Sequence, residues 1–124
     1  MTANQTKILQ VIKDSGPICA PEILKTLKQH NVYLNKTTVY RNITSLVDKN
    51  LLREVRVDPE KSYYESAELE HHHHFICQNC GKIRKVINAE LEQVIEKIEE
   101  SFMSSGITIS KHDLEFFGTC NNCH

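Results

Sequence analysis

The stretch HHHHFICQNCGK, residues 71–82, places four histidines directly before the Cys-x-x-Cys pair Cys77 and Cys80. An affinity tag does not explain this run, because tags sit at a terminus, whereas the run lies inside the chain and leads into apolar Phe75 and Ile76. Imidazole and thiolate groups are both metal ligands. The stretch therefore predicts metal binding within the fold.

A second Cys-x-x-Cys pair, Cys120 and Cys123, lies near the end of the chain. Each pair bends the backbone so that two sulfurs reach adjacent corners of a tetrahedron, and two pairs make a four-cysteine site for structural Zn2+. A thioredoxin-type redox centre, the alternative, needs only one pair in a βαβ setting. The fifth cysteine, Cys19, lies outside the quartet and is expected to be a small buried hydrophobic residue.

The length of the chain agrees with a fold that needs a metal. With 124 residues it can bury one modest core or two small ones, and cores below about 70–80 residues usually need a metal or a partner subunit. No stretch has the apolar length of a membrane span, and residues 1–14 are too polar for a secretory signal, so we expect a cytoplasmic protein without membrane contact. Reduced thiols in that compartment favour metal ligation over disulfides.

The net charge of −1 conceals a strong asymmetry between the two halves of the chain. Residues 1–53 hold eight Lys and Arg against three acidic residues, whereas residues 54–124 hold seven against thirteen. The basic half suits a polyanion, and the change of sign predicts two domains, 1–66 and 67–124. Lysines that merely solvate helix faces are the alternative interpretation.

Three helices followed by a hairpin are predicted for the first domain. Apolar residues recur at helical spacing within 8–12, 20–27 and 39–47, and Asn35 can cap the third helix. Residues 51–65 indicate a two-stranded hairpin around a turn at 58–61. This order is the plan of a winged helix-turn-helix, although basic helical bundles also exist. The side chains expected to reach a double-stranded DNA operator are Lys36, Thr37, Thr38, Tyr40 and Arg41.

The second domain is predicted to be a small α/β unit. A helix capped by Asn88 should run from 89 to about 103, and strands are expected at 71–77, 81–87, 107–110 and 112–119. Its apolar helix face suits dimerisation. The predicted fold class is thus α+β, with an N-terminal winged helix-turn-helix followed by a small α/β dimerisation domain that carries a four-cysteine zinc site.

The four histidines point alternately to two faces if residues 71–77 form a strand. His71 and His73 then face one side and His72 and His74 the other, so one run can serve two metal sites. A solvated polar strand end is the alternative. Side chains that could complete the two ligand shells are Glu65, Glu92 and His112.

In these motifs the chain resembles the ferric uptake regulator family of metal-responsive DNA-binding repressors, which includes iron, zinc and peroxide sensors. The resemblance covers nearly the whole chain, and the combination of a winged helix with His-rich and paired Cys-x-x-Cys motifs is highly specific. The matching segments are Thr38-Val39-Tyr40-Arg41, Tyr64-Glu65 at the end of the wing, the His-rich run leading into 76–82, and 118–123.

The resemblance implies a repressor of metal uptake or homeostasis genes that binds DNA as a homodimer. It further implies a structural zinc on the four cysteines and a regulatory divalent metal, Zn2+, Fe2+ or Mn2+. The positions that match ligands of the sensing site are Glu65, His72 and His74. The positions that match an additional site inside the dimerisation domain are His71, His73, Glu92 and His112.

Three departures from the family pattern bear on sensing and DNA contact. Pro17 and Lys85 stand where iron and peroxide sensors commonly have a histidine and an acid, and a charged lysine cannot ligate. The usual leading helix is missing, and Gln5 replaces an expected arginine. The remaining ligands are rich in nitrogen, which favours zinc over iron or manganese. Candidates to complete the sensing shell are Glu54, Asp58, Glu70, His30 and Cys19.

Other functions fit parts of the pattern. A zinc hydrolase or deaminase needs an open zinc with a general base, and the Pro-Cys-x-x-Cys of deaminases is absent because Ile76 precedes Cys77, so no enzymatic activity is expected. A zinc-stapled dimer with altered or lost sensing would bind DNA without regulatory metal. A peroxide-sensing regulator would instead respond through oxidation of a metal-bound histidine.

Overall fold

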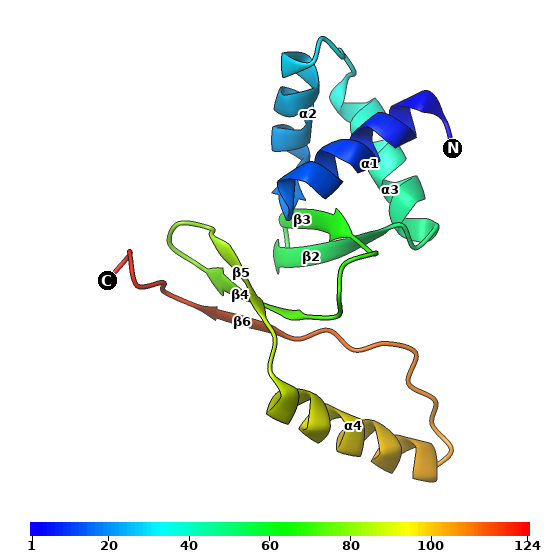
Figure 1. Cartoon of the computed structure of the whole chain (residues 1–124), viewed down its shortest axis with the longest axis vertical. Helices are drawn as coiled ribbons and strands as arrows, with labels where there is room; N and C mark the ends of the chain where they lie inside the picture. Colours follow the sequence, from blue (N-terminus) through cyan, green and yellow to red (C-terminus); the bar gives the residue numbers. More distant parts are fainter. The chain divides into compact units, whose positions relative to one another are not determined.

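The structure is a computed structural model that describes all 124 residues. The chain divides into two compact units, Met1–Glu70 and His71–His124, and most of their elements are labelled in Figure 1. None of the helices combines the length and the apolar composition needed to cross a lipid bilayer.

Three helices pack with a three-stranded antiparallel sheet in the first unit (Figure 1). The elements are α1 (Ala3–Ser15), β1 (Ile18–Cys19), α2 (Ala20–Gln29), α3 (Lys36–Asp48), β2 (Leu52–Asp58) and β3 (Lys61–Ser66). Each helix turns one apolar face inward, and the core includes Ile8, Ile12, Ile23, Val39 and Leu46. The predicted order of three helices and a β2–β3 hairpin is confirmed, and with it the winged helix-turn-helix plan.

Helix α3 begins where the sequence predicted. The side chain of Asn35 accepts a hydrogen bond from the Thr38 backbone N–H at 2.7 Å, which satisfies one of the amides that the first turn leaves without an intrahelical partner. Val39, Ile43 and Leu46 then fall on the buried face. The cap therefore fixes which side chains of the first two turns remain outside.

The segment that follows β3 is held against the hairpin by Arg53. Its Nη2 donates to the carbonyl oxygen of Leu69 at 2.7 Å and lies 3.4 Å from that of Ser66 and 3.5 Å from that of Ala67. Hydrogen bonds from a charged donor are stronger than neutral ones. Residues 66–69, which lead towards the histidine run, are thus anchored within the first unit.

A small sheet and one long helix make up the second unit (Figure 1). Its elements are β4 (His73–Cys77), β5 (Ile83–Val86), α4 (Ala89–Ser104) and β6 (Glu115–Gly118). Strand β4 lies in the middle, antiparallel to β5 and parallel to β6. As predicted, Asn88 caps α4 by accepting a hydrogen bond from the Leu91 N–H at 3.0 Å.

The strand predicted at 107–110 is wrong, and the strand predicted at 112–119 is shorter than expected. Only Glu115–Gly118 pairs with β4, whereas residues 107–114 connect α4 to β6 and find no strand partner in the unit. A pattern of alternating apolar residues can form a strand only where a neighbouring strand offers its backbone groups. His112 consequently lies on a connection and not on a strand.

The second unit buries few apolar side chains. Those that are buried are Ile76, Cys77 and Cys120. Helix α4 has no buried residue, and Val94, Ile98 and Phe102 on it are 54%, 51% and 43% exposed. So small a core does not supply the stability of a folded domain by itself. A metal or a second subunit has to supply the rest.

Candidate metal centres

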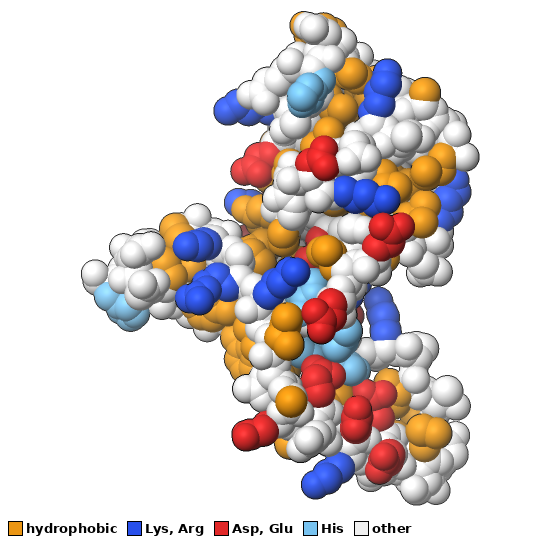
Figure 2. Space-filling view, in the orientation of Figure 1, with side chains coloured by type: hydrophobic (Ala, Val, Ile, Leu, Met, Phe, Trp, Pro, Cys, Tyr) orange, Lys and Arg blue, Asp and Glu red, His pale blue; other side chains and the backbone are white.

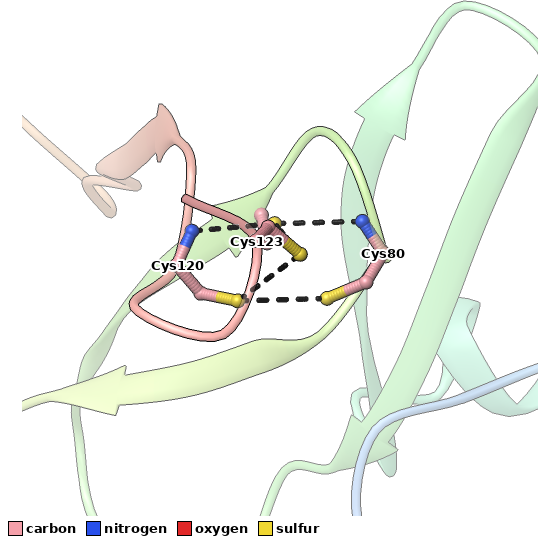
Figure 3. Close-up of side chains that lie close together, drawn as sticks. Cys80, Cys120 and Cys123 are labelled. Atoms are coloured by element: carbon pink, nitrogen blue, oxygen red, sulfur yellow. Dashed lines mark hydrogen bonds between the residues drawn. The ribbon is translucent and has the colours of Figure 1, made fainter.

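The four cysteines of the two Cys-x-x-Cys pairs converge at one end of the second sheet. Parallel pairing of β4 and β6 aligns Cys77 with Gly118, so both pairs follow the same sheet end. The Sγ atoms of Cys77 and Cys123, and those of Cys80 and Cys120, are 3.8 Å apart, and those of Cys120 and Cys123 are 3.5 Å apart. Figure 3 shows the sulfurs of Cys80, Cys120 and Cys123 turned towards one another.

These distances fit a tetrahedral zinc site. Sulfurs at about 2.3 Å from a zinc ion stand about 3.8 Å apart along the edges of a tetrahedron, whereas a disulfide requires about 2.05 Å. All five cysteines are free thiols. Four protein ligands leave no open coordination position, so the site suits structural Zn2+, as predicted.

The pKa values of two cysteines in the quartet also favour a bound cation. Backbone N–H groups of Cys80 and Cys120, each 3.4 Å from the sulfur, lower the pKa of Cys77 to about 6. The Asn79 side chain lowers the pKa of Cys123, but hydrogen bonding with Cys120 and burial outweigh it and raise that pKa to about 11. Cys77 therefore loses its proton easily, whereas Cys123 keeps its proton, so the two thiols do not ionise together. A divalent ion removes this conflict.

A second group of candidate ligands gathers around Glu92 on α4. Its Oε1 lies 2.6 Å from His73 Nε2, and its Oε2 lies 3.4 Å from His71 Nε2 and 3.7 Å from His112 Nε2. The Nε2 atoms of His71 and His112 are 3.1 Å apart. All four donors lie within 4.8 Å of one another, and Figure 2 shows histidine side chains beside acidic ones in the second unit. We name these four residues the Glu92 cluster.

The Glu92 cluster supplies three imidazoles and one carboxylate. Burial alone would raise the pKa of Glu92, but the hydrogen bond from His73 and the charges of His71 and His112 hold it below its ordinary value. A carboxylate that stays ionised can bind a cation at neutral pH. Four nitrogen and oxygen donors at these spacings fit a tetrahedral divalent ion.

Strand β4 begins at His73, two residues later than predicted, but His72 just before it and His74 on it still pair on the other face, as the alternation predicted. Their Nε2 atoms are 3.1 Å apart and their rings meet edge to face. The Nδ1 of His74 lies 3.7 Å from Glu115 Oε1, and Lys85 is its cross-strand neighbour on β5. Glu65, the third residue predicted for this site, is on β3 of the first unit, opposite Arg53.

The side chains predicted to contact DNA lie in the first two turns of α3. Lys36, Thr37, Tyr40 and Arg41 are exposed and line a shallow hollow, while Thr38 is half-buried. Lys36 Nζ lies 5.8 Å from the centre of the Tyr40 ring. The helix thus presents two cations, a phenol and a hydroxyl on one surface, which are donors suited to phosphates and base edges.

A model of the ferric uptake regulator family matches residues 1–117. The chain belongs to this family. Its members are metal-responsive transcription regulators, and they bind DNA as dimers. The match spans both units, including the Glu92 cluster and the first cysteine pair.

Comparisons with individual proteins of the ferric uptake regulator family support the assignment. A ferric uptake regulation protein of Neisseria meningitidis serogroup A is 27% identical over 99% of this chain and 85% of the relative. The Helicobacter pylori ferric uptake regulator, whose structure is described as revealing three functional metal binding sites, is 25% identical with a TM-score of 0.86, over 99% of this chain and 81% of that one. FurB from M. tuberculosis, a zinc uptake regulator, is 26% identical with a TM-score of 0.54, over 98% and 92%.

Three residues near the candidate metal sites and the α3 surface were not predicted from the sequence. Glu99 lies 2.8 Å from His112 Nδ1, Glu115 lies 3.7 Å from His74 Nδ1, and Thr44 lines the hollow on α3. Thr44 could have been found, because it lies four residues after Tyr40 on the same helix face. Nothing in the sequence singled out Glu99 or Glu115, because acidic residues are common on solvated surfaces.

Proposed function

We propose that the protein is a metal-responsive repressor that binds an operator as a homodimer and senses a divalent ion through Glu65, His72 and His74. The observation that carries the proposal is the arrangement of the histidines at the start of β4: His72 and His74 pair on one face, and His71 and His73 meet Glu92 on the other, in one chain with a basic, exposed α3. The DNA-binding domain is residues 1–66, and the dimerisation domain is residues 67–124. The protein acts in the cytoplasm, where its thiols stay reduced.

The spacing of His72 and His74 supports a shared ion. Two nitrogens bound tetrahedrally to zinc at about 2.0–2.1 Å stand about 3.3–3.4 Å apart, close to the 3.1 Å between the two Nε2 atoms. Only residues 66–71 separate Glu65 from this pair, and Arg53 anchors most of that segment. An ion bound by all three residues would fix the angle between the two domains, and with it the spacing of two α3 helices on DNA.

The donor set favours zinc as the sensed ion. Lys85 opposes His74 across the strands, and an ammonium group cannot ligate while it is charged. The proposed donors are therefore mostly imidazole, which suits zinc better than manganese or iron. The candidates for a further ligand remain those named from the sequence, with Glu70 nearest along the chain.

Replacing Arg41 tests the DNA-binding part of the proposal. Arg41→Ala should weaken binding to an operator duplex by about 1–3 kcal/mol, or about 5- to 150-fold, because a major-groove or phosphate contact is lost. Arg84→Ala is the matched control, since Arg84 is an exposed arginine on β5 of the second unit. Fluorescence anisotropy at fixed salt measures both affinities. Equal affinities of the two variants would contradict a role for α3 in binding.

The homodimer part of the proposal rests on the exposed apolar side of the second unit. Ile98→Glu should convert the protein to monomers, since a charge placed in an apolar interface costs at least about 2 kcal/mol, or about 30-fold in the dissociation constant. Lys97→Glu is the control, because it adds the same side chain at a polar, exposed position of α4. Sedimentation velocity gives the oligomeric state. A dimeric Ile98→Glu protein would place the interface elsewhere.

A further inference from the structure

Glu99 makes the shortest contact to His112 in the second unit, although it is not among the expected ligands. Its Oε1 lies 2.8 Å from His112 Nδ1, which is hydrogen-bond distance. Glu99 and Glu92 are seven residues apart on α4, or about two helical turns, so they project from the same face of the helix. One face of α4 therefore carries both Glu92, a candidate ligand, and Glu99, a carboxylate that contacts the candidate ligand His112.

His112 depends on side-chain contacts for its orientation. It lies on the connection between α4 and β6, where no strand pairing holds the backbone. Its ring packs against those of His71 and His73, with centroids 4.8 Å and 5.2 Å away. Such ring contacts leave the two nitrogens interchangeable by a flip of the ring. The contact with Glu99 distinguishes them, because a carboxylate accepts a hydrogen bond and cannot donate one.

The contact decides which nitrogen of His112 can bind a metal. A neutral imidazole carries one N–H, and if Nδ1 donates it to Glu99, the lone pair is on Nε2. Nε2 is the atom that lies 3.1 Å from His71 Nε2 and 3.7 Å from Glu92 Oε2, at the centre of the Glu92 cluster. The opposite tautomer would direct an N–H at that centre and could not ligate.

We propose that Glu99 is the positioning residue of the Glu92 cluster: it holds His112 in the Nδ1–H tautomer and thereby aims Nε2 at a bound divalent ion. This inference rests on the proposal that the cluster binds a metal. Carboxylates that orient a ligating histidine typically contribute about 10- to 100-fold to metal affinity, so loss of Glu99 should weaken binding at the cluster within that range.

Two variants separate orientation from charge. Glu99→Ala removes the acceptor, whereas Glu99→Gln keeps an oxygen that can accept the Nδ1–H but loses the negative charge. We expect Glu99→Ala to lose about 10- to 100-fold in zinc affinity and Glu99→Gln to recover most of it. Glu100→Ala, at an exposed neighbouring position on α4, is the control and should bind as the parent does. Competition with a chromophoric chelator measures the affinity of full-length protein that retains zinc on its cysteines.

NMR spectra of the His112 imidazole distinguish a positioning role of Glu99 from a merely structural one. Long-range 1H–15N spectra of the zinc-loaded protein report which nitrogen of His112 is bound and which is protonated, with His112→Ala assigning the signals. The parent and Glu99→Gln should show zinc on Nε2 and a proton on Nδ1, and Glu99→Ala should lose this pattern. An unchanged pattern and affinity in Glu99→Ala, while His112→Ala still abolishes binding, would overturn the inference alone. A parent whose zinc binding does not depend on His112 would overturn the cluster as a metal site as well.

Discussion

Cys120→Ser is expected to release the structural zinc and unfold the second unit, residues 71–124. Structural zinc contributes about 10–16 kcal/mol of apparent binding free energy to folding, which exceeds the whole stability of most domains. The unit has little else to hold it, because its buried apolar residues are few and α4 buries none. Elemental analysis should find less than one zinc per chain, and hydrogen exchange should show loss of protection in β4, β5 and β6.

The control for this prediction is Cys19→Ser, which alters a buried cysteine outside the quartet. It should retain zinc and the protection of the second sheet, with only a modest loss of stability in the first unit. A Cys120→Ser protein that kept a full equivalent of tightly bound zinc and an ordered second unit would contradict the four-cysteine site.

His72→Ala and His74→Ala are expected to abolish the effect of metal on DNA binding. Allosteric coupling is typically about 1–3 kcal/mol, so the parent should bind its operator about 5- to 150-fold more tightly when the sensing ion is present. Either variant should bind DNA with the affinity of the metal-free parent at every metal concentration, because the ion can no longer favour one domain arrangement. The measurement is a metal titration followed by fluorescence anisotropy of a labelled duplex.

His124→Ala serves as the control, since this histidine follows the last cysteine and belongs to neither imidazole group. It should respond to metal as the parent does. The variants must also remain dimeric in sedimentation experiments, so that lost coupling is not confused with lost assembly. A full metal response in both His72→Ala and His74→Ala would remove these residues from sensing.

Local sequence rules predicted the elements that depend on local chemistry. Asn35 and Asn88 cap helices because a short polar side chain beside a helical pattern has an amide within reach. The alternation of the four histidines followed from strand geometry alone. Two Cys-x-x-Cys pairs predicted one site, because a zinc ion is the ligand that most readily satisfies four thiolates.

Features that depend on distant partners could not be predicted. Ile18–Cys19 is too short to show a pattern, and it forms a strand only because β3 offers an edge. Ile107 and Ile109 alternate like a strand, yet that segment has no strand partner in the unit. From the sequence, Glu99 looks like any other solvent-exposed acidic residue of α4. Only the tertiary structure shows that its carboxylate lies 2.8 Å from His112. Such contacts arise from tertiary structure and leave no trace in spacing.

In the proposed mechanism a divalent ion, bound apart from the four cysteines, controls DNA affinity. The most direct test selects an operator duplex from a random pool and measures its affinity for dimeric protein that retains one zinc per chain on the cysteines, with and without added Zn2+, Fe2+ or Mn2+. We predict that at least one ion, with zinc foremost, raises affinity by about 5-fold or more. Identical affinities with and without every ion would contradict metal sensing and leave a zinc-stapled DNA-binding dimer.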